Sequence, residues 1–290
     1  MTSLRRRMQI DLRLRNYSIN TERVYLRHAD LFVRHFNRSP VRLGPDHIRA
    51  YLLYTIETRA CSWSWWRQAV ASLRFLYGTT LGRREVVPQI PFPRREVRLP
   101  IVLSPGEVER LLNAVHLLKH KIILMAMYSA GLRVSEALCL TNGDIDSASM
   151  LIHVRQGKGR RDRIVPLAPT LLDAIRQYRR THKTGPWLFP GQDPHRPLTT
   201  RAVQWMTSKA RLRANIEKHA TPRTLRHSFA THHLEAGTDI LTIQRLLGHA
   251  HLQSTLVYLH LSRRHISSVP SPLERLGVEV APTQLTLRGL

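Results

Sequence analysis

A stretch rich in proline and arginine divides this chain of 290 residues into two parts. It covers residues 83–100 and reads RREVVPQIPFPRREVRLP. Proline interrupts regular secondary structure and restricts the backbone, so such a stretch is typical of a linker. We therefore expect one domain at residues 1–82, a basic linker, a second domain at residues 101–269, and a C-terminal tail at residues 270–290.

The first part has the apolar periodicity of a small helical bundle. Ser18 offers an N-cap, after which Val24, Leu31 and Phe32 fall on one face of a helix. A later segment carries three tryptophans that we expect mainly in the core: Trp63, Trp65 and Trp66. Arginines recur along the bundle at Arg13, Arg15, Arg23, Arg27, Arg34, Arg49, Arg67 and Arg74. An arginine-rich helical surface suggests contact with a phosphate backbone.

The second part opens with a strong helix start. Ser104 is a good N-cap, Pro105 suits the first helical position, and Glu107 completes a capping box. The run Ile122–Tyr128 is apolar almost all round, which predicts a buried helix that ends at Gly131.

The period changes from helical to alternating within residues 149–167. Ile152 and Val154 alternate with other residues, Gly157-Lys158-Gly159 supplies a turn, and Arg163–Leu167 returns as a second strand. Further helices are expected at 171–180, from 198–200 to 213, at 222–234, at 240–247 and, briefly, at 272–276. The chain is therefore expected to be mainly α with a small β-sheet.

The charge balance points to a polyanionic partner. Lys and Arg number 45 against 20 Asp and Glu, which gives a formal net charge of +25. Such a surface attracts nucleic acid, and the basic residues recur in every segment rather than in one tail. The simpler alternative is a basic protein that its charge keeps soluble.

Cysteine usage and hydropathy suggest a cytoplasmic protein. Cys61 and Cys139 have no spacing of a zinc site or a disulfide framework, and we expect both to be small core residues in a reducing compartment. The longest apolar run, Ile122–Tyr128, is far too short for a membrane span, and the N-terminus lacks the apolar core of a signal peptide.

Residues near the C-terminal end combine into one candidate site. Arg223 and Arg226 lie three apart at a helix start, His249 follows a helix that ends in Leu-Leu-Gly, and Tyr258 comes nine residues later. Two guanidiniums can hold a phosphate, an imidazole can hydrogen-bond it, and a phenol can attack it. Taken singly, Tyr258 would more often be a core residue and His249 a helix cap.

Two further cations have an ordinary and a functional interpretation. Arg133 stands in an apolar neighbourhood, where it either pairs with Glu136 or is held to meet an anion. Lys158, at the hairpin tip, is either a solvated lysine or an ammonium that reaches a phosphate or protonates a leaving oxygen.

Four motifs in order resemble the tyrosine recombinase (phage-integrase) family. They are AGLRVSEAL at 130–138, GKGRRDRIVPL at 157–167, TPRTLRHSFATHHLEAG at 221–237 and LLGHAHLQSTLVYLH at 246–260. YSINTERVY at 17–25 is similar to the family's helical, SAM-like core-binding domain, so the resemblance covers roughly residues 8–265. It implies this bundle plus a mixed α+β catalytic domain that together clamp double-stranded DNA.

The resemblance also implies a role for each candidate residue. Tyr258 would attack a DNA phosphodiester and form a 3′-phosphotyrosine. Arg133 and Arg226 would clamp the non-bridging oxygens, Lys158 would protonate the leaving 5′-oxygen, and His249 would hydrogen-bond the phosphate. Because the covalent intermediate keeps the bond energy, no ATP, metal or other cofactor is required.

The same resemblance implies assembly and a biological setting. Family members work as homotetramers on two DNA sites, often by passing a C-terminal segment to a neighbour, which here would be the segment after Ser262. The chain lacks the long insertion of integron integrases and an evident arm-binding domain before residue 8. Both absences favour a simple Xer-like or transposon-associated recombinase.

One position departs from the family pattern. The family usually has histidine where this chain has Arg223, and arginine cannot accept a proton. We expect Arg223 to act as a third phosphate cation. His227 is adjacent to Arg226 but one residue further round the helix, so we expect it to point elsewhere.

Three alternatives to a recombinase stay open at this point. A type IB topoisomerase-like enzyme would share the chemistry but relax DNA, and a catalytically impaired, integrase-like DNA-binding protein would explain Arg223. DNA cleavage would separate the second from the others. A ribosome- or RNA-binding protein fits the charge but gives no reason for Tyr258 at its spacing from His249.

Overall fold

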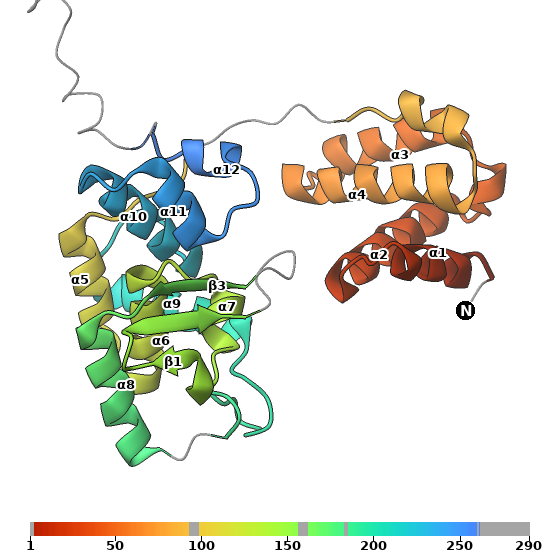
Figure 1. Cartoon of the computed structure of the whole chain (residues 1–290). Helices are drawn as coiled ribbons and strands as arrows, with labels where there is room; N and C mark the ends of the chain where they lie inside the picture. Colours follow the sequence, from red (N-terminus) through yellow and green to blue (C-terminus); the bar gives the residue numbers. More distant parts are fainter. Residues whose placement is uncertain (1–2, 93–98, 156–161, 183–184, 260, 262–290) are drawn as a thin grey trace, which may run out of the picture. The chain divides into compact units, whose positions relative to one another are not determined.

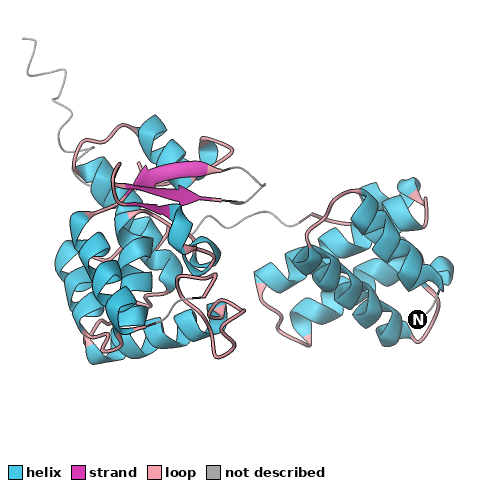
Figure 2. Cartoon of the chain, turned by 60° about the horizontal axis from the view of Figure 1, so that its bottom comes forward, coloured by secondary structure: helices cyan, strands magenta, loops and turns pink. Residues whose placement is uncertain are grey.

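The computed structural model describes residues 3–92, 99–155, 162–182, 185–259 and 261. The chain divides into two compact units, Met1–Val97 and Arg98–Leu290. Both are built mainly of helices, and the described strands form one small sheet in the second unit (Figure 2). The mainly helical fold with a small sheet is thus confirmed.

The first unit packs four α-helices and three short helical turns around one core. Its elements are α1 (Ser3–Leu14), α2 (Ile19–Phe36), η1 (Pro40–Arg42), α3 (Pro45–Glu57), α4 (Trp63–Phe75), η2 (Leu76–Thr80) and η3 (Arg84–Gln89). Ser18 caps α2 as its sequence predicts, because its side chain accepts a hydrogen bond from the Thr21 amide. Phe32, Tyr51 and Tyr77 lie buried in the middle, with ring planes steeply inclined to one another.

Part of the expected linker belongs to the first unit. Val86 and Ile90 are each only 1% exposed, so two apolar side chains of this arginine-rich stretch pack into the core of the first unit. Arg74 of α4 donates to the carbonyls of Val87 and Ile90, at 2.9 Å each. The tryptophan prediction is confirmed for Trp65 and Trp66, which pack on the core, and is wrong for Trp63, which is 39% exposed at the start of α4.

The second unit carries its small sheet at one side of a group of helices (Figure 1). Its elements are α5 (Pro105–Asn113), α6 (Leu118–Ser129), α7 (Val134–Leu138), η4 (Asn142–Asp144), β1 (Ile145–Asp146), β2 (Leu151–Val154), β3 (Arg163–Pro166), α8 (Pro169–Thr181), α9 (Thr200–Arg213), α10 (Pro222–Glu235), α11 (Ile240–Leu247) and α12 (Gln253–Leu256). Ser104 and Glu107 form the predicted capping box at the start of α5.

The alternating stretch forms the predicted antiparallel pair. In β2 and β3, Leu151 faces Pro166 and Val154 faces Arg163. The short strand β1 adds an antiparallel third member beside β2, which sequence periodicity did not predict because it is only two residues long. Lys158 and the predicted turn lie outside the described residues.

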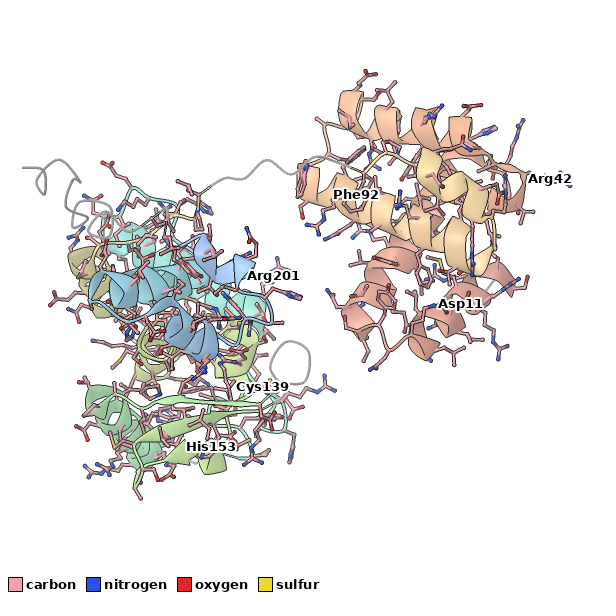
Figure 3. The ribbon with its side chains drawn as sticks, turned by 45° about the horizontal axis from the view of Figure 1, so that its top comes forward. Asp11, Arg42, Phe92, Cys139, His153 and Arg201 are labelled. Carbon is pink, nitrogen blue, oxygen red and sulfur yellow. The ribbon has the colours of Figure 1, made fainter. Side chains whose placement is uncertain are left out.

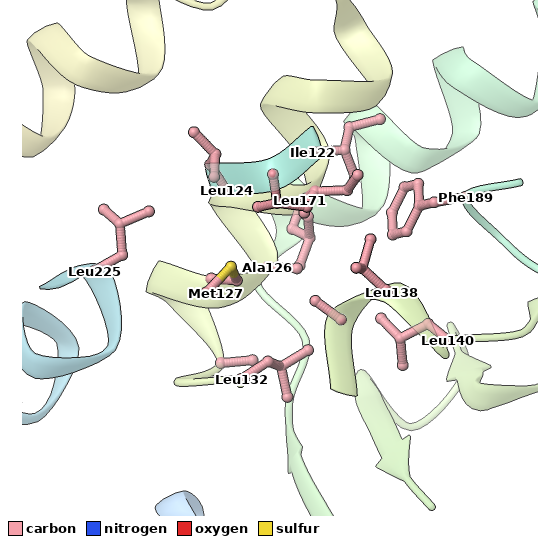
Figure 4. Packing of buried hydrophobic residues seen from close by; sticks show 14 of the residues in the cluster. Ile122, Leu124, Ala126, Met127, Leu132, Leu138, Leu140, Leu171, Phe189 and Leu225 are labelled. Atoms are coloured by element: carbon pink, nitrogen blue, oxygen red, sulfur yellow. The ribbon is translucent and has the colours of Figure 1, made fainter. Parts of the chain in front are cut away.

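Helix α6 is the centre of the core. Ile122, Leu124 and Met127 are each at most 1% exposed, which confirms the predicted buried helix. Figure 4 shows α6 with Leu225 of α10 on one side and Phe189 on the other. Because α10 packs directly on α6, the arginines of α10 are held by a rigid support.

The predictions for the two cysteines and for a helix near the C-terminus are not confirmed. Cys139 is exposed and Cys61 is only partly buried, so the prediction that both are core residues is wrong. Cys139 follows the short helix α7 and lies between the buried residues Leu138 and Leu140. The short helix expected at 272–276 lies outside the described residues. Within the described residues, no helix is both long and apolar enough to cross a membrane.

Candidate active site

Three arginines converge on one buried carboxylate in the second unit. Glu136 on α7 has a side chain only 4% exposed. Arg133 donates to it over 2.5 Å, Arg163 of β3 binds both its oxygens at 3.0 and 2.7 Å, and Arg226 of α10 lies 3.6 Å away. We call these four residues the arginine cluster. Its three positive charges face one negative charge, so the cluster carries a net charge of +2.

The carbonyls at the end of α11 orient the same arginines. Arg163 donates to Leu246 O at 2.7 Å, Arg226 to Leu247 O at 2.5 Å, and Arg133 to Gly248 O at 3.3 Å. The C-terminal carbonyls of a helix lack helical partners and carry partial negative charge. Three consecutive carbonyls therefore fix three guanidiniums without cancelling their formal charge.

The ionisation of Glu136 reflects this environment. Burial alone would raise its pKa, but hydrogen bonds and the charge of Arg163, together with Arg133, lower the pKa to about 2. Burial and then the charge of Arg133 lower the pKa of Arg226 to about 9. Both groups therefore stay ionised at neutral pH, and the cluster is a fixed cationic centre.

Gly131 is required by the geometry that orients Arg226. Its φ of +60° is unfavourable for other residues, and a Cβ there would lie 2.6 Å from the ring of Phe229. Arg226 donates to the Gly131 carbonyl at 2.5 Å. The glycine thus allows the backbone after α6 to turn so that the Gly131 carbonyl accepts from the buried guanidinium of Arg226.

Tyr258 lies buried beside this cationic centre. It is 1% exposed and packs with residues of α10 and α11, among them Phe229 and Leu247. Burial raises its pKa, whereas the charges of Arg226, Arg223 and Arg133 act in the opposite direction. A phenol in this position meets several positive charges that favour its anionic form.

His227 contacts Tyr258, so the prediction that it points elsewhere is wrong. His227 Nδ1 lies 3.0 Å from Tyr258 Oη. The helical-wheel argument considered α10 alone, whereas Tyr258 approaches from the segment after α12 and meets the face that carries His227. Burial, then the charges of Arg223 and Arg226, lower the pKa of His227 to about 4, so its ring is neutral at neutral pH.

His249 is a second histidine next to the tyrosine ring. The two rings are parallel within 10°, with centroids 6.5 Å apart. His249 Nδ1 is 2.9 Å from Thr255 Oγ1, and burial followed by the charge of Arg226 lowers its pKa to about 3. A neutral imidazole that is fixed at Nδ1 keeps Nε2 for another partner.

Arg223 occupies the outer face of α10. Its residue is exposed, and its Nε donates to His227 Nε2 at 3.1 Å. The structure therefore brings together Arg133, Arg226, His249, Tyr258 and Arg223, while the predicted Lys158 lies outside the described residues.

Sequence reasoning missed Arg163, and it considered Glu136 only as a partner of Arg133, although Glu136 also pairs with Arg163 and Arg226. The signal for Arg163 was strand alternation, since Arg163 and Val165 share the inward face of β3 and have an exposed residue between them. An arginine on an inward strand position requires a buried partner. The ordinary and the functional interpretations of Arg133 are compatible, because its ion pair with Glu136 is what holds it in the site.

A metal centre has no support in the described part of the chain. Its residues include no group of three or more His, Cys, Asp or Glu side chains that could hold a metal ion. The positive charge of the site comes from guanidiniums.

Comparison with known proteins assigns the chain to a family. Residues 102–265 match the model of the phage integrase family, and residues 4–85 match the model of its N-terminal SAM-like domain. The chain belongs to the phage integrase family.

Individual relatives agree with this family membership. An integrase/recombinase from Sinorhizobium fredii is 44% identical over 98% of this chain and 92% of its own length. Tyrosine recombinase XerC from Listeria monocytogenes is 32% identical, over 88% of this chain and 91% of the relative.

A solved structure supports the same fold. The integrase of transposon Tn1549, in complex with transposon right end DNA, has a TM-score of 0.71 over 96% of this chain and 100% of that chain. At 19% identity, this likeness concerns the fold alone.

Proposed function

We propose that this protein is a site-specific DNA recombinase that cleaves and rejoins DNA through a 3′-phosphotyrosine on Tyr258. The observation that carries this proposal is the buried, net positive arginine cluster beside that phenol. A phenol with a pKa of about 10 is a weak nucleophile at neutral pH unless cations stabilise its anion and the charge of the transition state.

Each residue of the site has a role in the proposed reaction. Tyr258 Oη forms a bond to phosphorus while the bond from phosphorus to the 5′-oxygen breaks. Arg133 and Arg226 bind the non-bridging oxygens, and His249 hydrogen-bonds the phosphate through its remaining nitrogen. Lys158 gives a proton to the leaving 5′-oxygen. Rejoining is the reverse, with a 5′-hydroxyl attacking the phosphotyrosine.

Arg223 adds a third phosphate cation from the exposed face of α10. Its residue is exposed, and its Nε bond to His227 leaves the two terminal nitrogens to face solvent or phosphate. Unchanged cleavage in Arg223→Ala would contradict this role.

Double-stranded DNA is the proposed partner, bound over both units. The net charge of +25 supports this partner, as do exposed basic side chains such as Arg42 and Arg201, whose nitrogen tips extend outward (Figure 3). The relative in transposon Tn1549 was solved with DNA. We also propose a homotetramer on two DNA sites in the cytoplasm, which analytical ultracentrifugation of the protein–DNA complex would test.

Covalent trapping on DNA tests the function. The full chain is incubated with nicked duplexes drawn from a random library and run on a denaturing gel beside Tyr258→Phe. A protein–DNA band that is absent from the variant is expected, and sequencing the trapped DNA then identifies the site. Tight binding without such a band would favour a binding-only protein instead.

Strand exchange separates a recombinase from a topoisomerase-like enzyme. Two duplexes that carry the trapped site are labelled differently and incubated with the protein. Products that join the two labels are expected. Relaxation of supercoiled DNA without joined products would contradict the recombinase assignment.

A further inference from the structure

Arg223, His227 and Tyr258 form a continuous line of hydrogen bonds from the surface into the site. Arg223 and His227 lie four apart on α10, so their side chains share a face. Arg223 is exposed, His227 is half-buried and Tyr258 is 1% exposed. The two links measure 3.1 Å, from Arg223 Nε to His227 Nε2, and 3.0 Å, from His227 Nδ1 to Tyr258 Oη.

The donor and the acceptor of each hydrogen bond follow from which groups carry a proton. Guanidinium nitrogens only donate, so Nε2 of His227 accepts from Arg223 and carries no proton. The ring is neutral at neutral pH because burial and nearby arginines disfavour its cation. A neutral imidazole has one proton, and here it must be on Nδ1. Nδ1–H therefore donates to Tyr258 Oη.

We propose that His227 is a catalytic hydrogen-bond donor that stabilises the phenolate of Tyr258, and that Arg223 is a positioning residue that sets the tautomer of His227. This inference rests on the proposed function of Tyr258 as the nucleophile. It assigns the histidine a donor role, in contrast to a proton acceptor, because Nδ1 is already protonated. The arginine that replaces the usual histidine of the family thus fixes the tautomer of His227, one turn later on α10.

The proton and electron balance of the step is simple. The Tyr258 O–H bond breaks and its proton passes to solvent water, which leaves the electron pair on Oη. That oxygen forms the bond to phosphorus, the bond from phosphorus to the 5′-oxygen breaks, and the leaving oxygen is protonated by the general acid. His227 keeps its proton throughout.

The groups around Tyr258 favour this route. Burial raises the pKa of Tyr258, and the charges of Arg226, Arg223 and Arg133 offset part of that rise. His249, parallel to the tyrosine ring, is neutral as well. Cations and a hydrogen-bond donor around one phenol oxygen all stabilise its anion rather than accept its proton.

The tautomer can be measured on the free protein. The full chain is labelled with ¹⁵N-histidine, and the His227 signals are assigned by their loss in His227→Asn. At neutral pH we expect a protonated Nδ1 and an unprotonated Nε2. In Arg223→Met, which removes the donor, the proton should redistribute toward Nε2. A wild-type ring protonated at Nε2 would overturn the inference, and so would a tautomer that Arg223→Met leaves unchanged.

A matched pair of variants tests the donor role in the reaction. Asparagine at 227 can place an N–H donor near the position of Nδ1, whereas leucine, of similar size, has no donor. Neither residue can take up a proton. Single-turnover formation of the covalent complex should stay within about 5-fold of wild type in His227→Asn, whereas His227→Leu should lose about 100-fold, as on removal of one donor to an oxyanion. DNA binding by both variants serves as the folding control.

The outcomes separate this inference from the proposed function. If His227→Asn loses as much rate as His227→Leu while wild type forms the covalent complex, the function stands and the donor role fails. If wild type forms no covalent complex with the expected tautomer present, the proposed function fails and the hydrogen-bond geometry stands.

Discussion

Arginines of the first unit and arginines of the cluster in the second unit have the same chemistry in opposite settings. On the first unit, the side chains of Arg34 and Arg49 are 76% and 59% exposed. In the cluster, those of Arg163 and Arg226 are 9% and 7% exposed. Exposed charges are screened by salt and keep their rotamer freedom, whereas buried charges with fixed partners need no reorganisation during a reaction. We infer that the first set supplies affinity for DNA and the second supplies chemistry.

The largest expected effect comes from removing the carboxylate of the cluster. Glu136→Gln leaves three guanidiniums around a neutral amide, and loss of one partner from a buried ion pair costs about 3–5 kcal/mol. Thermal or denaturant unfolding of the full chain measures this loss. Glu109→Gln, at an exposed position on α5, is the matched control and should change stability by less than about 0.5 kcal/mol. Equal stabilities of the two variants would contradict the role of Glu136.

The effect of Glu136→Gln on stability should depend on pH. The folded-state pKa of Glu136 is depressed to about 2, below the unfolded value near 4.3, so its stabilisation is complete above about pH 4.3 and is lost as pH falls toward 2. The stability difference between wild type and Glu136→Gln should therefore shrink across this window. A difference that stays constant from pH 5 to pH 2 would rule out the depressed pKa.

The next largest effect separates chemistry from affinity within the site. In Arg226→Lys, an ammonium replaces a planar fork that binds Gly131 O and Leu247 O, so the positive charge loses its fixed orientation. Covalent complex formation should fall by about 10²–10³-fold, as on loss of a transition-state donor, while DNA affinity changes little. Arg213→Lys, exposed on α9, is the control. Equal losses of affinity and rate would contradict the division of roles.

A smaller effect is expected from the backbone that supports the cluster. Gly131→Ala places a Cβ against Phe229 at a φ of +60°, and we expect a total cost of about 1–3 kcal/mol from backbone strain and overpacking. Unfolding measurements should show this loss. Gly106→Ala, inside α5 with only a 4.0 Å contact to Arg110, should instead be neutral or slightly stabilising.

The smallest effect tests the exposed arginines. Arg23 and Arg27 are exposed on α2, and their joint replacement by glutamine should weaken DNA binding with little effect on the rate at saturating protein. If each contacts one phosphate, the slope of log affinity against log salt should fall by about 1.8, or 0.9 per charge. An unchanged slope with a slower reaction would reverse the assignment of the two sets.

Local signals in the sequence predicted much of the fold. The start of α5 at Ser104 and the start of α11 at Asp239 were predictable because each cap bonds amides within three residues. The strand β1 escaped prediction because two residues carry no periodicity. The segment 84–90 was assigned to a linker from its composition, whereas its packing depends on apolar contacts that only the folded unit reveals.

The site was predictable only in part, because its members are far apart in the chain. Arg163 binds Glu136, 27 residues away, and Leu246, 83 residues away, and no local pattern encodes either contact. The error at His227 has the same origin, since its partner Tyr258 comes from another segment 31 residues later. Resemblance to a family assigned roles to single residues, and the structure added the carboxylate and the carbonyls that hold them.

The most direct test of the central claim is to locate the atom that DNA becomes attached to. Covalent complexes trapped on nicked duplexes are digested with nuclease and protease, and the nucleotide-bearing peptide is sequenced by mass spectrometry. We expect the nucleotide on Tyr258, linked through its 3′-phosphate, and a free 5′-hydroxyl on the released strand. Attachment to another residue, or through a 5′-phosphate, would contradict the proposal that the arginine cluster activates Tyr258.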